Sequence, residues 1–244
     1  MNDKKKRMMG GAAPIPDLPS SFNVHYDFSN SSCYSGSGTT INNLVGGSNG
    51  STNNGATFSS SDNNGAFQFD GTNDFLQTSF RFYGGIFGNS NYTLSFWIKT
   101  GSSVSGTHPL ISANHSQPSG MGGAWVTGGK FYGWRMTSGA TVSKALSSAS
   151  SIAANTIYNL TYKSNGNYMH VFINGVEDSA TTEVATSQLW EDETLLSTIG
   201  TTVDIYNRTV GWFNGSMYAF ISWDSVLSDA QILDIYNNGK GNYS

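Results

Sequence analysis

The sequence is poor in charged residues, in cysteine and in long hydrophobic runs. Only 11% of its 244 residues are Asp, Glu, Lys or Arg. The single cysteine, Cys33, excludes an internal disulfide framework and a cysteine-based zinc site. No apolar run approaches the length of about 20 residues that a transmembrane helix needs. We therefore expect a soluble protein with no internal disulfide and no membrane span.

The few basic residues cluster at the start of the chain. Lys4, Lys5, Lys6 and Arg7 form one block, and the remainder of the sequence holds more acidic than basic residues. An acidic body argues against nucleic-acid binding by the folded domain. Because no sustained apolar segment follows the block, we expect no signal peptide and synthesis in a host cytoplasm.

The first 20 residues are predicted to form an extended arm, ahead of a folded domain at residues 21–244. Three of the five prolines lie in this arm, among them Pro14 and Pro16. Each proline biases the residue before it toward an extended backbone. A basic arm of this kind is either solvated or docked on an acidic partner surface.

The body of the chain is polar but largely uncharged, because Gly, Ser, Thr and Asn take the place of charged residues. It also contains 6 Trp, 12 Tyr and 14 Phe, which argues against a disordered chain. Aromatic residues set among glycine and asparagine favour short strands joined by many turns. The composition therefore predicts an all-β protein.

Alternation of apolar residues predicts the main strands. In residues 92–99 and 157–163, every second residue is apolar, which places these side chains on one face of a strand. Residues 168–173 run into Asn174-Gly175, a strong hairpin signal because both residues tolerate a positive φ. Residues 217–223 predict a last long strand.

One short helix is predicted near the C-terminus. Ser228 and Gln231 have the spacing of a capping box, in which each side chain bonds the other residue's backbone N–H. Ile232 and Ile235 lie on one apolar stripe. Gly239 is predicted to end the helix, because glycine is common just after a helix C-terminus.

Four segments, in order, resemble motifs of one protein family. They are F-D-G-T-N-D-F-L at residues 69–76, T-L-S-F-W-I at 93–98, V-F-I-N-G-V at 171–176 and F-N-G continuing to W-D-S-V-L-S-D-A-Q-I at 213–232. The chain resembles the concanavalin A-like lectin/glucanase superfamily, in its laminin G-like and pentraxin-like form. The resemblance covers roughly residues 22–240. It implies a jelly-roll β-sandwich with one short C-terminal helix behind the extended N-terminal arm.

The resemblance admits several functions, of which catalysis is the least expected. Glucanases of this fold use carboxylates in an E-x-D-x-x-E pattern on one strand, since one must protonate the leaving oxygen while another attacks. The only acidic cluster here is Glu191-Asp192-Glu193, whose neighbours on a strand would point to opposite faces. No nucleophile stands in a recognisable catalytic motif. We therefore expect a protein that is not an enzyme.

No cofactor is required by the sequence, although the resemblance admits a structural calcium ion. Asp70 and Asp74 lie in a turn that could hold one ion, but Asp also suits turns through its bonds to the backbone, and we favour that role. In pentraxin-like relatives an acidic run supplies further ligands. The corresponding residues 199–207 carry only Asp204, which departs from the pattern.

Aromatic residues are the candidates for glycan recognition. Trp125, Phe131, Tyr132 and Trp134 fall in a glycine-rich stretch, and Tyr206 and Trp212 are second-rank candidates. Exposed aromatic rings can stack on sugar rings. The alternative is that these side chains alternate within a buried strand, which we favour from the sequence alone.

Two functions follow as hypotheses. The first is a non-enzymatic virion structural or decoration protein, of capsid or tail, that binds other virion proteins through its arm. Its Gly/Asn/Ser/Thr-rich loops resemble those of jelly-roll domains in phage structural proteins. The alternative is a glycan-binding module for attachment to a host surface. The sequence leaves a homo-oligomer open.

Overall fold

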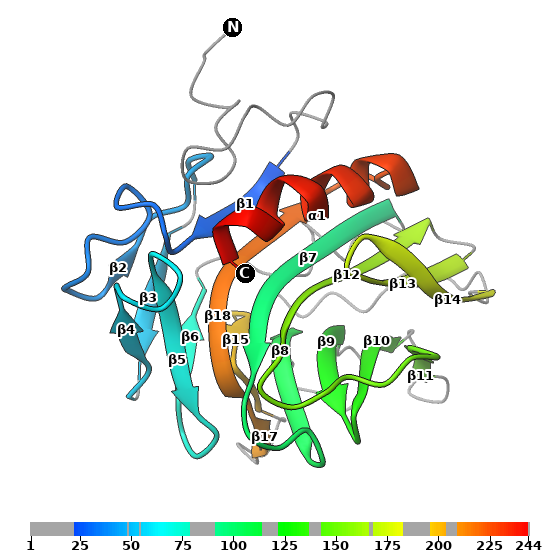
Figure 1. Cartoon of the computed structure of the whole chain (residues 1–244), viewed down its shortest axis with the longest axis horizontal. Helices are drawn as coiled ribbons and strands as arrows, with labels where there is room; N and C mark the ends of the chain where they lie inside the picture. Colours follow the sequence, from blue (N-terminus) through cyan, green and yellow to red (C-terminus); the bar gives the residue numbers. More distant parts are fainter. Residues whose placement is uncertain are drawn as a thin grey trace, which may run out of the picture.

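The computed structural model describes residues 22–47, 49–53, 55–78, 91–113, 122–136, 143–165, 168–182, 196–203 and 209–243. This part of the chain forms two eight-stranded sheets, a two-stranded ribbon and one helix (Figure 1). All strand pairs for which a register is defined are antiparallel. The predictions of an all-β sandwich and a C-terminal helix are confirmed.

The first sheet is built around three long central strands, β12, β7 and β18. Its order is β14-β13-β12-β7-β18-β5-β4, and β1 pairs with β18 beside this path. The strands span β1 (Phe22–Asp27), β4 (Thr57–Ser59), β5 (Ala66–Asp70), β7 (Asn91–Thr100), β12 (Ile157–Asn165), β13 (Tyr168–Ile173), β14 (Val176–Thr182) and β18 (Asn214–Trp223).

The second sheet faces the first and has the order β11-β10-β9-β8-β15-β6-β3-β2. Its strands are β2 (Thr40–Ile41), β3 (Gly50–Asn53), β6 (Phe75–Gln77), β8 (Thr107–Ala113), β9 (Gly122–Thr127), β10 (Lys130–Met136), β11 (Ser143–Ser147) and β15 (Thr198–Ile199). A ribbon of β16 (Thr201–Val203) and β17 (Thr209–Trp212) lies against β8.

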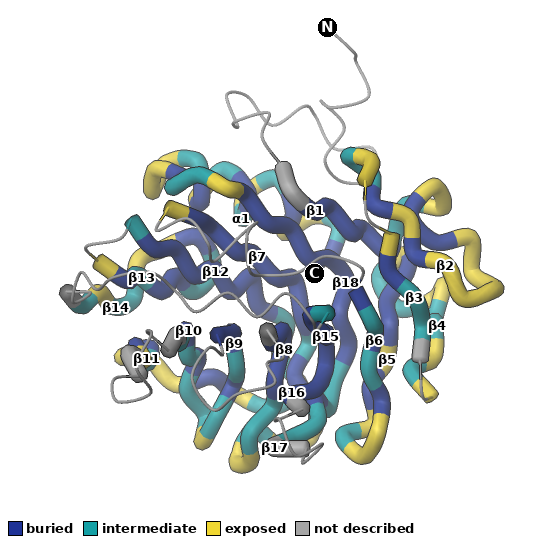
Figure 2. The backbone as a smooth tube through the Cα atoms, turned by 180° about the vertical axis from the view of Figure 1, so that it is seen from behind, coloured by how far each residue is buried: buried dark blue, intermediate teal, exposed yellow. Residues whose placement is uncertain are grey.

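The main core fills the space between the two sheets, and the buried central strands are visible in Figure 2. Tyr92, Leu94, Phe96 and Ile98 are all fully buried in it, as the alternation predicted. Burying each such side chain stabilises the fold by about 1.5–3 kcal/mol. The same alternation sends the intervening side chains to the outer face of the first sheet.

The predicted hairpin between β13 and β14 is confirmed. Asn174 has a φ of 53° and Gly175 a φ of 80°. Two successive residues in the left-handed region are what a two-residue type I′ turn requires, and its twist matches that of the flanking strands.

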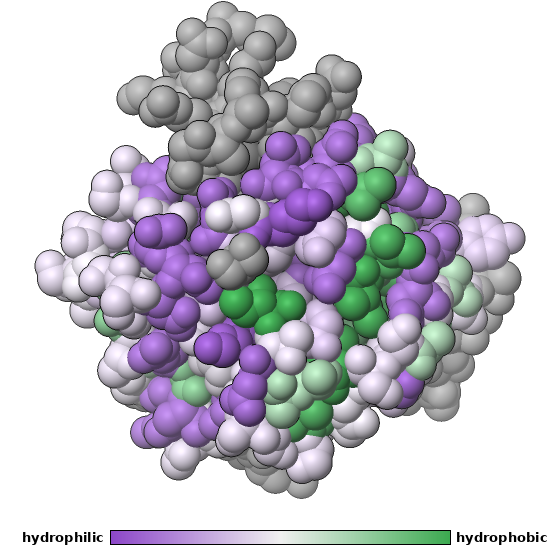
Figure 3. All heavy atoms as spheres, viewed as in Figure 1, coloured by the Kyte–Doolittle hydropathy of each residue, from purple (hydrophilic) through white to green (hydrophobic). Residues whose placement is uncertain are grey.

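A helix, α1 (Asp229–Tyr243), covers the outer face of the first sheet. The capping box is confirmed: Ser228 N donates to Gln231 Oε1 at 2.8 Å, and Gln231 N donates to Ser228 Oγ at 3.2 Å. Ile232 and Ile235 are buried in a second apolar cluster beneath the helix. Figure 3 shows that this face of the molecule is largely hydrophilic, with smaller hydrophobic areas.

The prediction that Gly239 ends the helix is wrong. The helix continues to Tyr243, and Gly239 is buried inside it. A Cβ at this position would lie 2.5 Å from Cζ2 of Trp97, so glycine is present for close packing and not as a terminator. Among the described residues, no helix has the length and apolar character needed to cross a membrane.

Candidate functional site

Strands β9 and β10 place three of the predicted aromatic residues on the outer face of the second sheet. Trp125 lies directly opposite Tyr132, and Trp134 opposite Gly123, so all these positions share one face. Phe131 points the other way and is fully buried in the core, which excludes it from the site. Trp125, Tyr132 and Trp134 are half-buried, and together we call them the tryptophan patch.

The two indole rings of the patch contact each other edge to face. Their centroids are 4.8 Å apart and their planes are inclined by 60°. Trp125 Nε1 donates to Ser112 Oγ on β8 at 3.2 Å. Trp134 Nε1 is buried without a hydrogen-bond partner. The patch therefore holds one indole N–H in a fixed bond and leaves a second one unsatisfied.

Gly123 makes room for this arrangement. A Cβ at Gly123 would lie 3.1 Å from Trp125 Nε1 and 3.3 Å from Trp134 Nε1, so both nitrogens converge above it. It would also lie 2.5 Å from the carbonyl oxygen of Ile111. On its other side, Trp134 faces the small, exposed Ala145 of β11. The residues directly opposite Trp134 on both neighbouring strands are therefore small, and its ring leans onto Trp125.

The ribbon supports the patch from the side of β8. The hydroxyl of Ser112, which holds Trp125, is itself in close contact with the hydroxyl of Thr202 on β16. Both residues are fully buried, so they position the ring and do not meet solvent. Trp212 also lies on the ribbon, but its ring contact is with Phe75, at 6.2 Å between centroids. The structure thus brings Trp125, Tyr132 and Trp134 together and places Trp212 apart from them.

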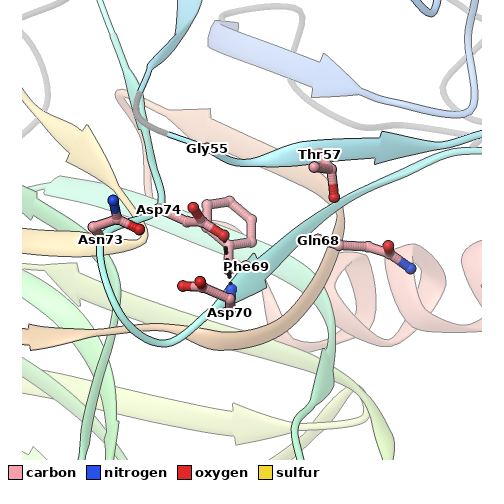
Figure 4. Close-up of a pocket in the computed structure, with 7 residues that line it drawn as sticks. All are labelled: Gly55, Thr57, Gln68, Phe69, Asp70, Asn73 and Asp74. Carbon is pink, nitrogen blue, oxygen red and sulfur yellow. Dashed lines mark hydrogen bonds between the residues drawn. The ribbon is translucent and has the colours of Figure 1, made fainter.

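The turn that was predicted to hold a calcium ion lines a separate hollow of about 380 Å³ (Figure 4). Asp74 Oδ2 accepts a hydrogen bond from Asp70 N at 2.8 Å, and Asp70 Oδ1 accepts one from Thr72 N at 2.7 Å. Burial raises the pKa of Asp74, although the hydrogen bond from the backbone N–H of Asp70 acts in the opposite direction. Both carboxylates therefore serve the turn, which is the role that we favoured.

These residues do not fit a calcium ion by themselves. Calcium takes about 6–8 oxygen ligands, whereas this turn offers two carboxylates that already accept backbone N–H groups. Within the described ranges, no group of three or more His, Cys, Asp or Glu side chains is placed to hold a metal. Asp204, the third predicted ligand, lies outside the described residues. The calcium ion stays a prediction.

Comparison with known protein families shows the superfamily of the chain. Residues 70–233, more than half of the sequence, match the family model of the concanavalin A-like lectin/glucanases superfamily. The chain belongs to this superfamily. The resemblance drawn from the four motifs is confirmed, and the sandwich has a concanavalin A-like fold. A search of curated proteins found no match.

Solved structures of other proteins share the architecture at low identity. Domain 4 of an extracellular arabinanase from Geobacillus stearothermophilus, in complex with arabinotriose, is 14% identical with a TM-score of 0.65, over 88% of this chain and 98% of that one. The ligand-binding domain of botulinum neurotoxin serotype D, in complex with N-acetylneuraminic acid, is 14% identical with a TM-score of 0.66 over 89% of this chain. The binding domain of Paraclostridial mosquitocidal protein 1 is 13% identical, with a TM-score of 0.66 over 89% of this chain.

The two toxin domains are longer than this chain. The match spans 50% of the neurotoxin domain and 52% of the mosquitocidal domain, so about half of each has no counterpart here. At these identities the likeness establishes the concanavalin A-like fold and nothing finer.

Several predicted residues of this concanavalin A-like chain lie outside the described ranges. They are the arm residues Lys4, Lys5, Lys6, Arg7, Pro14 and Pro16, the candidate Tyr206, and the acidic cluster at 191–193. Sequence reasoning also missed Gly123, Ser112 and Thr202. The pair Gly122-Gly123 could have pointed to this site, because glycine inside a strand often marks a close approach of other groups.

Proposed function

We propose that this chain is a non-catalytic carbohydrate-binding module, and that the tryptophan patch is where a sugar ring binds. The observation that carries the proposal is the pair of partly exposed indole rings on the outer face of the second sheet. An aromatic face stacks well on the C–H face of a sugar.

The indole N–H groups of the patch are not open to a ligand, because Trp125 Nε1 is bonded to Ser112 and Trp134 Nε1 is buried. The partly exposed ring faces are therefore the surface that a sugar ring can contact. Trp125 is already held by Ser112, so its ring is pre-oriented before the ligand arrives.

The structural neighbours support a saccharide ligand by analogy of fold. One neighbour is described in complex with arabinotriose and another in complex with N-acetylneuraminic acid. Fold alone does not assign function, so the argument for this chain stands on the tryptophan patch. The virion role and the docking of the arm on other virion proteins stay predictions. If the chain is displayed on a particle, the patch would serve host attachment.

A glycan array with matched variants tests the proposal. We expect the wild-type protein to retain a defined set of glycans, and Trp125→Ala and Trp134→Ala each to weaken binding about tenfold or more, as for other buried aromatic anchors. Tyr168→Ala is the control, because Tyr168 is an exposed aromatic residue on the first sheet, away from the patch. Binding that survives both tryptophan variants, at unchanged melting temperature, would overturn the location.

A further inference from the structure

A second hollow of about 450 Å³ lies at the other side of the sandwich. The segment between β1 and β2 forms one wall, and β4 with the turn after it forms the other. We call it the serine pocket, and it is lined by Phe28, Ser29, Ser31, Tyr34, Ser35, Gly36, Ser37, Phe58, Ser60 and Asn64. Figure 1 shows β4 and β10 on opposite sides of the view, so this pocket is distinct from the tryptophan patch.

Aromatic rings give the serine pocket a firm wall. Phe58 packs edge to face against Tyr34, with centroids 5.0 Å apart, and against Phe67 at 5.6 Å. Tyr34 OH donates to Gly38 O at 2.8 Å, which ties the loop down. Phe58 is only half-buried, so part of its ring remains open to a ligand.

The polar groups of the pocket are neutral, and several are unused. Ser31, Ser37, Ser60 and Asn64 are exposed, and their side chains make no hydrogen bond within the described part of the chain. None of the lining residues is ionised at neutral pH. Tyr34 is the only ionisable one among them, and burial raises its pKa above the usual value for tyrosine. An aromatic wall beside free hydroxyl and amide groups suits a neutral, hydroxyl-rich ligand better than an ion or an apolar molecule.

We propose that the serine pocket is a binding site for one neutral sugar residue of an oligosaccharide. The C–H face of the sugar lies against Phe58, and its hydroxyls bond with the free serines and Asn64. The serine pocket shares no residue with the tryptophan patch, so the two proposals can be tested independently of each other. With both sites present, one chain has two separate points of contact for glycans.

Ser60→Tyr tests the proposal, because the larger side chain fills the pocket from an exposed position. Ser61→Tyr is the matched control, since Ser61 is the next residue, is also exposed and does not line the pocket. Phe58→Leu is the second variant, which removes the ring but keeps an apolar side chain. Binding of neutral arabino-, xylo-, malto- and galacto-oligosaccharides is measured by calorimetry and NMR, with sialylated glycans as the charged comparison.

We expect the Trp134→Ala protein to retain weaker binding of neutral oligosaccharides. Adding Ser60→Tyr to this protein should weaken that remaining binding at least tenfold. Adding Ser61→Tyr should leave it unchanged. The same loss is expected with Phe58→Leu at an unchanged chemical-shift pattern elsewhere. Equal binding by the Ser60→Tyr and Ser61→Tyr proteins would overturn the inference, as would exclusive binding of sialylated glycans. Loss of all binding with Ser60→Tyr but none with Trp134→Ala would support the pocket and refute the patch.

Discussion

Trp125 and Trp134, nine positions apart on neighbouring antiparallel strands, meet edge to face with their ring centroids 4.8 Å apart. Such aromatic pairs contribute about 0.5–1.5 kcal/mol beyond the area that they bury. On the outer face of a sheet this contact also fixes the orientation of both rings before any ligand binds. A pre-oriented aromatic surface loses less entropy on binding than a mobile one.

Two glycines of α1 should respond in opposite ways to replacement by alanine. We expect Gly239→Ala to destabilise the protein by about 1–3 kcal/mol, because the added Cβ would overpack against Trp97. Trp97 cannot move away easily, since its ring stacks on Tyr236 and contacts Tyr243.

Gly241 is the matched control within the same helix. A Cβ there meets nothing within 4 Å, so Gly241→Ala should stabilise the protein by up to about 1 kcal/mol through helix propensity. Urea denaturation of the two variants measures the difference. Equal effects of the two substitutions would contradict the packing assigned to Gly239.

The buried ammonium group of Lys163 should depend on Asp229. Lys163 Nζ lies 2.5 Å from Asp229 Oδ1, donates to Leu227 O at 3.2 Å and sits 4.8 Å from the centroid of Phe172. We expect Asp229→Asn to cost about 1 kcal/mol, because Lys163 loses its charged partner while the 65% exposure of the Asp229 side chain lets solvent screen the pair. Asp224→Asn, at an exposed position nearby in sequence, should change the free energy of unfolding by less than about 0.5 kcal/mol. Similar values for the two variants in urea denaturation would refute this role.

Stability should fall in mild acid because of His25. Burial lowers the pKa of His25 from 6.5 to about 4, although nearby Asp27 acts in the opposite direction. Above pH 6.5 the residue is neutral in both the folded and the unfolded state. Between pH 6.5 and 4 the unfolded chain binds the proton and the folded one resists it, so stability drops by up to about 1.4 kcal/mol per pH unit.

Urea denaturation at pH 7 and pH 5 checks this dependence. His25→Asn should flatten the pH profile even if it lowers stability at pH 7. His108, whose pKa is also lowered by burial, contributes in the same direction and remains in both proteins. A wild-type stability that does not change between these pH values would contradict the account.

Cys33 should be unreactive while the protein is folded. It is fully buried, and desolvation raises its pKa to about 12. The thiolate is the reactive form, so almost none is present at pH 8. We expect no labelling by a thiol reagent in buffer and complete labelling in denaturant. Rapid labelling of the native protein would show that the segment after β1 opens readily.

The fold was predictable from the sequence wherever local chemistry decides the outcome. The alternation in residues 92–99, the hairpin at Asn174-Gly175 and the capping box at Ser228 each depend on residues close together in the chain. The end of α1 was not predictable in this way. Gly239 fits a helix terminator locally, and only its contact with Trp97, far away in sequence, reveals its packing role.

The candidate site was predictable in part, for the same reason. The sequence singled out Trp125, Tyr132 and Trp134, but the face that a strand buries depends on the opposite sheet. Burial of the whole stretch, which we favoured, holds for Phe131 and not for these three residues. The support from Thr202 comes from 90 residues beyond Ser112, and no local pattern connects the two.

The most direct test of carbohydrate binding at the patch is the indole N–H region of a two-dimensional ¹H–¹⁵N NMR spectrum during titration with a saccharide from the glycan array. The chain has 6 Trp, and Trp→Phe variants assign their signals. We predict that the Trp125 and Trp134 signals shift in a saturable manner, while those of Trp97 and Trp223, buried beneath α1, stay in place. Shifts confined to other tryptophans, or no shift at a concentration that saturates the protein, would contradict the proposed function.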